Sequence, residues 1–104
     1  MQDDLLKTLG LMRRAGKLSA GEDGVRQAVR KRSARLILVA ADASENAVKR
    51  AEGFAEAAQV PLIRLDENKD ALCQALHVNG GAMFAVCDEG FKQLFLKKQR
   101  ESQT

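Results

Sequence analysis

The chain has 104 residues, a mass of 11.4 kDa, 45% hydrophobic residues and 30% charged residues. A chain of this length builds one hydrophobic core, so we expect a single domain over residues 1–104. Its longest apolar stretch, residues 36–41, is far shorter than the about 20 residues that cross a bilayer, which argues against a membrane partner. Residues 1–4 show no secretory pattern, and we expect a cytoplasmic protein.

Positive charge is concentrated in the first half of the chain. Residues 1–50 carry 11 Lys and Arg against 6 Asp and Glu, whereas residues 51–104 carry 6 against 8. Nine of the cations fall between Lys7 and Arg35, where Glu22 and Asp23 are the only acids. Such a block of cations favours binding to a polyanion, because each phosphate that a cation neutralises releases counterions and this release drives association. The pattern favours a nucleic-acid partner, although a solvated basic helix surface has the same composition.

Helix and strand patterns alternate along the chain. The run at 36–41 has no polar alternation, which is typical of a central strand that is covered on both faces. The alternation of helices with short strands predicts an α/β/α three-layer sandwich around a mixed four-stranded sheet. The expected helices are 4–15, 21–31, 45–58, 67–76 and a terminal helix from 89, and the expected strands are 17–19, 36–41, 62–65 and 82–87.

Capping residues mark the ends of these helices. Gly16 supplies the left-handed residue that ends the first helix. Ser44, Asp66 and Asp88 each precede a helical pattern and are predicted N-caps. In the last helix Phe91, Leu94 and Phe95 are expected to be buried, and the polar residues beyond 96 to be frayed.

The sequence offers little support for catalysis. The only histidine, His77, has no nucleophile near it in the chain, and Asp42 is expected to serve a turn. Cys73 and Cys87 form neither a disulfide framework nor a zinc-binding pattern, so we expect buried reduced thiols. Neither a Walker loop nor a GxGxxG motif follows a strand, so no metal and no cofactor are expected. We therefore predict that the protein is not an enzyme.

The composition also narrows the possible modes of nucleic-acid binding. The chain has no Trp or Tyr, and its four Phe residues fall on or beside apolar stripes, which disfavours base stacking on an aromatic sheet. The segment 21–24 matches the GXXG loop of KH domains, but its two carboxylates would repel phosphates. The remaining mode of nucleic-acid binding is one in which the start of a helix and a loop present backbone amides and polar side chains to a structured RNA.

The segment 13–44, RRAGKLSAGEDGVRQAVRKRSARLILVAADAS, resembles the kink-turn-binding ribosomal protein superfamily of the L7Ae and L30e type. The phrases GKL at 16–18, GED at 21–23 and LVAADAS at 38–44 are most similar to its small bacterial YlxQ-like branch. The resemblance continues through VPL at 60–62, the helix at 69–76 and AVCDEGF at 85–91. It implies an α/β/α sandwich that binds RNA without catalysis.

The family signature for kink-turns, Gly-x-Asn-Glu-x-x-Lys, falls on residues 21–27 of this chain. Asp23 stands in the place of Asn, Gly24 in that of Glu and Gln27 in that of Lys. Asp cannot donate as an amide does, and Gly24 has no side chain, so readout of guanine edges is weakened. The second contact region that the family implies is the loop at Asn79, Gly80 and Gly81.

Two functions follow from the sequence and the resemblance. The first is a ribosome- or ribonucleoprotein-associated protein of translation that binds rRNA or another kink-turn-like RNA, with ribosomal proteins as further partners and no DNA. The alternative is a protein-interaction module on the same fold that has lost kink-turn recognition. The predicted RNA-binding residues are Arg13, Arg14, Lys17, Gly21, Glu22, Asp23, Gly24, Arg26, Gln27, Arg30, Lys31, Asn79, Gly80 and Gly81, with no catalytic and no metal-binding residues.

Overall fold

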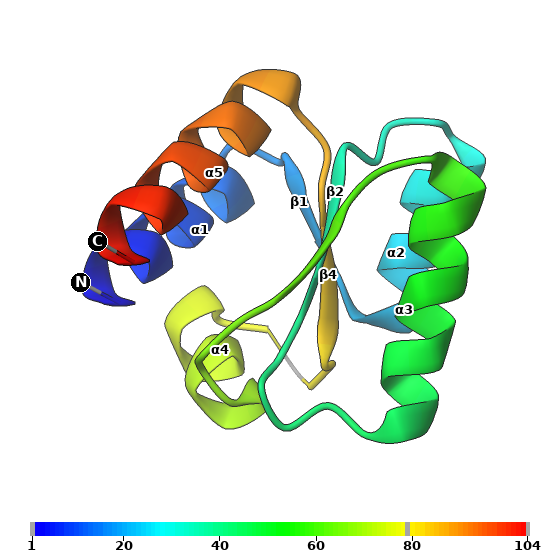
Figure 1. The fold of residues 1–104 in the computed structure, drawn as a ribbon, viewed down its shortest axis with the longest axis horizontal. Helices are drawn as coiled ribbons and strands as arrows, with labels where there is room; N and C mark the ends of the chain where they lie inside the picture. The colour runs from blue at the N-terminus through cyan, green and yellow to red at the C-terminus, as the bar shows by residue number, and fades with distance from the viewer. Residues whose placement is uncertain (1, 79, 104) are drawn as a thin grey trace.

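The structure is a computed structural model that describes residues 2–78 and 80–103. Helices and strands alternate from the first described residue to the last, as the sequence predicts (Figure 1). The helices are α1 (Gln2–Arg14), α2 (Gly21–Arg30), α3 (Glu45–Ala58), α4 (Lys69–Leu76) and α5 (Glu89–Gln103), and the strands are β1 (Leu18–Ala20), β2 (Leu36–Val39), β3 (Leu62–Arg64) and β4 (Met83–Val86).

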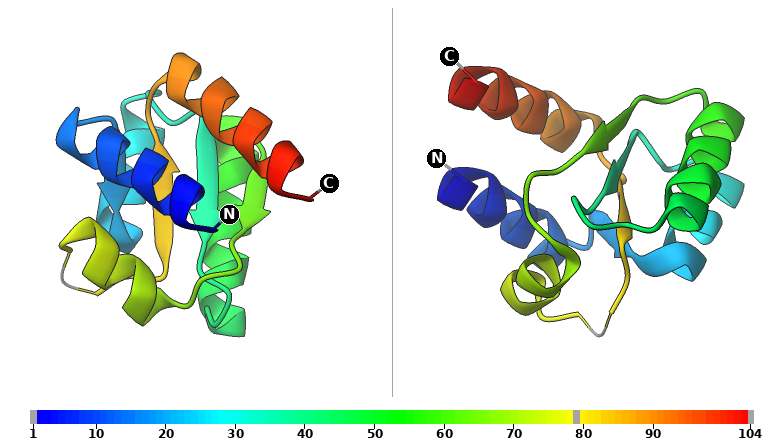
Figure 2. Two further views of the ribbon diagram at one scale, coloured as in Figure 1. Left: turned by 90° about the vertical axis from the view of Figure 1, so that its left-hand side faces the viewer. Right: turned by 60° about the horizontal axis from the view of Figure 1, so that its bottom comes forward.

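The sheet has the order β1-β4-β2-β3 and separates two layers of helices. β4 is antiparallel to both β1 and β2, whereas β2 and β3 are parallel, so the sheet is mixed. Helices α1, α4 and α5 cover one face, and α2 and α3 cover the other (Figures 1 and 2). This arrangement confirms the predicted α/β/α sandwich.

Alternate residues of the two inner strands feed two separate cores, because successive side chains of a strand point to opposite faces. Leu36, Leu38 and Phe84 pack with α1, α4 and α5. Ile37 and Val39 pack with α2 and α3. Both inner strands are fully buried, which explains why the run at 36–41 shows no polar alternation.

Two of the three predicted N-caps are confirmed. Ser44 Oγ accepts the Ala47 N–H at 3.1 Å, and Asp88 Oδ2 accepts the Phe91 N–H at 2.9 Å. The prediction for Asp66 was wrong, because α4 begins two residues later than that cap requires. Its N-cap is Asn68, whose Oδ1 accepts the Ala71 N–H at 2.8 Å.

The C-terminal helix is longer than the sequence suggested. Residues beyond 96 continue as helix to Gln103, so the expectation of fraying was wrong. Lys98 Nζ lies 2.9 Å from Asp4 Oδ2 and joins α5 to α1, and the hydrogen bond from Lys98 lowers the pKa of the Asp4 carboxyl. Phe95 is buried as expected, whereas the Leu94 side chain is 37% exposed. None of the described helices is both long and apolar enough to cross a membrane.

Glu67, in the bend between β3 and α4, carries an unusual carboxylate. Its Oε2 is buried without a hydrogen-bond partner among the described residues. Burial raises the pKa of this carboxyl, and the negative charge of Asp66 raises it further. Relative to its ordinary range, the Glu67 carboxyl is therefore easier to protonate in the folded state.

We predict that Glu67→Gln stabilises the protein near neutral pH. A carboxyl whose pKa is raised in the folded state stabilises that state in acid. This contribution to the free energy of unfolding is lost as the pH rises through the raised pKa. The gain of the variant over the parent should therefore be largest near about pH 7 and vanish near about pH 4 in urea unfolding. Glu52→Gln, at an exposed position of α3, is the matched control. A gain that does not change with pH would contradict a burial effect.

Candidate nucleic-acid interface

The start of α2 and the loop before β4 meet at the edge of the sheet. β1 and β4 are antiparallel, and Ala20 lies opposite Phe84. The chain that leaves β1 at Gly21 therefore lies beside the chain that enters β4 from Gly81. Both glycines have positive φ, 80° and 109°, and a Cβ on Gly81 would lie 3.1 Å from the Gly21 Cα. The close approach therefore requires glycine at position 81, whereas a Cβ on Gly21 would meet nothing within 4 Å and glycine is favoured there by its positive φ.

The first turn of α2 faces a hollow of about 520 Å³ and has no side-chain cap. Its N-cap residue is Ala20, which offers no acceptor to the free amides of the first turn. Such amides can donate to an anion or to a polar base edge. The hollow is lined by Ala20, Gly21, Glu22, Asp23, Gly80 and Gly81.

Two further hollows continue this one along β1, and we call the three together the β1 groove. The second hollow, of about 440 Å³, shares Ala20 and Gly80 with the first, and the third, of about 260 Å³, shares Ser19 with the second. β1 is an edge strand, so its outer side is open to a ligand. The second and third hollows are lined by Arg13, Leu18, Ser19, Ala20, Gly24, His77, Val78 and Gly80, and by Gly16, Lys17, Ser19, Gln27, Ala28, Lys31, Ser33 and Cys87.

The two acids at the start of α2 are paired with arginines. Arg26 places one guanidinium nitrogen 2.7 Å from Glu22 Oε2 and the other 2.7 Å from Asp23 Oδ1. Arg50 of α3 approaches Glu22 Oε1 at 3.3 Å. The Arg26 guanidinium also lies 5.8 Å from the centre of the Phe54 ring. These pairs reduce the repulsion that Glu22 and Asp23 would exert on phosphates. They also mean that the Arg26 guanidinium is already paired with carboxylates.

The other predicted cations are exposed and form no ion pair with a described side chain. Arg13, Lys17 and Lys31 line the β1 groove, and Arg30 lies on the exposed side of α2. Arg14 instead lines a different hollow between α1 and α4. The structure thus brings three of the predicted cations to one groove and places Arg14 outside it. Asn79 lies outside the described residues.

Several groove residues were missed by sequence reasoning. Ser19 and Ser33 reach the groove through the pairing of β1 and the turn after α2, which no local pattern reveals. His77 ends α4 in the left-handed conformation, with φ 57°, and lines the second hollow. Cys73 and Cys87 are both free thiols and are partly buried rather than buried as predicted, and Cys87 lines the third hollow. Its N–H donates to the Lys17 carbonyl at 2.8 Å, at the end of the β1–β4 pair.

The remaining candidate groups of the chain are dispersed. Asp42 Oδ1 accepts the Lys69 N–H at 2.8 Å and so helps to hold the start of α4. No group of three or more potential metal ligands occurs among the residues that the structure describes.

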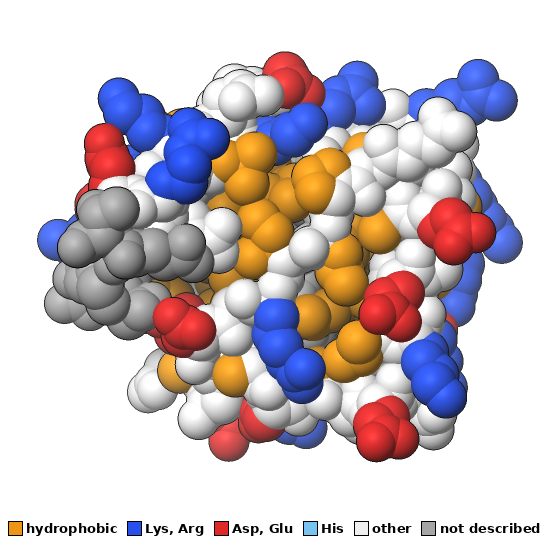
Figure 3. Space-filling view, in the orientation of Figure 1, with side chains coloured by type: hydrophobic (Ala, Val, Ile, Leu, Met, Phe, Trp, Pro, Cys, Tyr) orange, Lys and Arg blue, Asp and Glu red, His pale blue; other side chains and the backbone are white. Residues whose placement is uncertain are grey.

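The face around the other sheet edge, near β3, shows exposed hydrophobic side chains with Lys, Arg, Asp and Glu scattered around them (Figure 3). Neither sign of charge predominates on that face.

The fold and the groove define a class of protein: a small α/β/α sandwich with an open, partly basic groove at the β1 edge of its sheet. The chain belongs to the ribosomal protein L7Ae/L30e/S12e/Gadd45 family, whose pattern matches residues 3–95. It is 34% identical over 83 residues to the RNA-binding protein YlxQ of Bacillus subtilis (strain 168), a match that covers 80% of this chain and 82% of that protein.

A solved structure shares the fold of this chain. A protein with unknown function from Bacillus halodurans C superposes with a TM-score of 0.79 at 27% sequence identity. The superposition covers 89% of this chain and 93% of the other. The shared arrangement therefore extends over nearly the whole sandwich.

We predict that Gly81→Ala destabilises the protein by about 1–3 kcal/mol, because it strains a positive φ and pushes a Cβ against Gly21. Gly80→Ala is the control, since Gly80 also has a positive φ but a Cβ there meets nothing within 4 Å. Urea unfolding should show the larger loss for Gly81→Ala. Equal losses would mean that the Gly21–Gly81 approach contributes nothing beyond backbone strain.

Proposed function

We propose that this protein is a non-catalytic RNA-binding protein that holds a structured RNA in the β1 groove. The observation that carries the proposal is the junction of Gly21 and Gly81, where the uncapped start of α2 faces a hollow that continues into the hollows lined by Arg13, Lys17 and Lys31. Membership of the L7Ae family and the similarity to an RNA-binding protein support it. We also propose that the protein acts in the cytoplasm as part of a ribosome or another ribonucleoprotein.

The groove supplies two kinds of contact. Arg13, Lys17 and Lys31 can neutralise phosphates along its length. The α2 amides, the Gln27 amide and the Ser19 hydroxyl can hydrogen-bond to base edges or riboses. Phosphate contacts position an RNA, and the polar contacts select among RNAs.

A standard kink-turn is a poor match for these side chains. The Asp23 side chain is 92% exposed, but it is a carboxylate and is paired with Arg26. Gly24 contributes only backbone to the groove, and Gln27 replaces an ammonium with a neutral amide. We therefore propose that the protein binds a structured RNA whose recognition depends less on hydrogen bonds to guanine edges than recognition of a standard kink-turn does.

The first test measures the salt dependence of RNA affinity. If Arg13, Lys17, Arg30 and Lys31 each contact a phosphate, log affinity should fall with log salt concentration with a slope of about −3. The RNA is the one recovered by crosslinking to the protein in cells, and binding is measured by fluorescence anisotropy. A slope near zero would contradict the basic groove as the site.

The same RNA tests the position of the site. The double variant Lys17→Glu with Lys31→Glu should weaken binding by at least about a hundredfold, because it reverses two charges in one hollow. Lys49→Glu with Lys97→Glu makes the same change of net charge at exposed positions of α3 and α5. Equal losses for the two double variants would show that only the overall charge matters, and duplex DNA is the specificity control.

The second test restores the family signature. Asp23→Asn, Gly24→Glu and Gln27→Lys together should raise the affinity for a standard kink-turn RNA, since each good edge contact contributes about 1–3 kcal/mol. A Cβ at position 24 is tolerated, because it would lie 3.4 Å from the Ser19 Cβ, in ordinary contact. If the parent binds a kink-turn as tightly as the variant does, the argument from missing side chains fails.

A further inference from the structure

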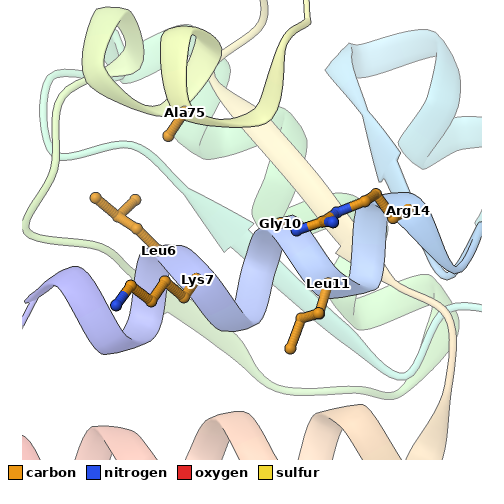
Figure 4. A pocket seen from close by; sticks show the side chains of 6 residues that line it. All are labelled: Leu6, Lys7, Gly10, Leu11, Arg14 and Ala75. Atoms are coloured by element: carbon orange, nitrogen blue, oxygen red, sulfur yellow. The ribbon is translucent and has the colours of Figure 1, made fainter.

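A second surface lies outside the β1 groove, on the exposed side of α1. It is an open groove of about 420 Å³ between α1 and α4, and we call it the α1 groove. In Figure 4 the Leu6 and Ala75 side chains point toward each other from the two helices, and the Arg14 side chain extends along α1 in the direction of Gly10. Its lining consists of Leu6, Lys7, Gly10, Leu11, Arg14 and Ala75.

The residues of α1 in this groove follow one stripe of the helix. Lys7, Gly10, Leu11 and Arg14 are spaced by three, one and three positions, which places them on one face over two turns. Leu11 is 50% exposed and is the more exposed of the two large hydrophobic side chains that lie open on the described surface. A cation stands at each end of this stripe, and neither forms an ion pair with a described side chain.

Gly10 leaves the backbone of α1 open at the centre of the stripe. A glycine inside a helix costs about 1 kcal/mol relative to alanine. A Cβ on Gly10 would meet nothing within 4 Å, so no contact within the protein requires a glycine there. Gly53 in α3 is equally open, so the glycine alone does not mark a site. The distinguishing feature of Gly10 is its place between an exposed leucine and two cations.

We propose that the α1 groove binds an amphipathic helix of a protein partner that carries carboxylates on both sides of its apolar stripe. Leu6, Leu11 and Ala75 offer apolar contacts, and Gly10 lets a second helix approach closely. Lys7 and Arg14 lie about 10 Å apart along the helix axis, which matches acidic residues two turns apart on the partner. The unpaired cations select an acidic partner over a basic one.

The α1 groove and the β1 groove have no lining residue in common. Arg13 lines the β1 groove and Arg14 the α1 groove, so the end of α1 separates the two sites. A partner helix on α1 would then contact the protein beside the RNA without competing for its lining. The exposed leucine and the apolar floor distinguish the α1 groove from a further phosphate-binding surface.

The test uses a designed helical peptide of about 18 residues, long enough to retain helix in solution, with leucines flanked by glutamates two turns apart. Titration into the ¹⁵N-labelled protein should shift the amides of Leu6, Lys7, Gly10, Leu11, Arg14 and Ala75. The same peptide with lysines in place of the glutamates is the charge control and should leave them unshifted.

Gly10→Gln should weaken peptide binding by at least about tenfold, because its side chain fills the place of closest approach. Gly53→Gln makes the same change in another helix interior and should bind like the parent. RNA affinity should be the same for both variants. Equal binding by the lysine peptide, equal effects of the two glutamine variants, or loss of RNA affinity in Gly10→Gln alone would each overturn the proposal.

Discussion

The antiparallel pairing of β1 with β4 is the constraint on which the candidate site depends. Because Ala20 lies opposite Phe84, the segment that follows β1 must run beside the segment that precedes β4. The two backbones pass this closely because residue 81 is glycine, since a Cβ there would press on the Gly21 backbone, whereas Gly21 itself supplies the positive φ of the turn. One end of the groove therefore follows from the register of two short strands, and the other end, at Lys17 and Cys87, from the same ladder.

Local patterns were sufficient to predict most of the fold. The buried run at 36–41 identified the central strand, and Ser44 and Asp88 marked helix starts correctly, because these signals act within a few residues. Asp66 is not the N-cap of α4, because Asn68 lies directly before the start of this helix and caps it. The hydrogen bond from the Lys69 N–H to Asp42 also holds the helix start. The length of α5 was missed because an ion pair with Asp4, distant in sequence, supports its last turns.

The candidate site was predicted in part, for the same reason. The glycines and cations of 13–31 are visible in the sequence, and three of the cations do line one groove. The pairing of Glu22 with Arg50 could not be read from the sequence, because it joins two helices across 28 positions. Charge counting also treated Arg26 as free, whereas it is held between two carboxylates of its own helix and the Phe54 ring.

The most direct measurement of the central claim is a map of RNA contacts on the ¹⁵N-labelled protein. The crosslinked RNA should shift the amides of Ser19, Gly21, Gly24 and Gly81, which surround the junction of α2 with the loop before β4. Amides near the opposite sheet edge, at Leu62 and Ile63 of β3, should stay in place. Shifts confined to the β3 edge, with the junction unperturbed, would contradict the account.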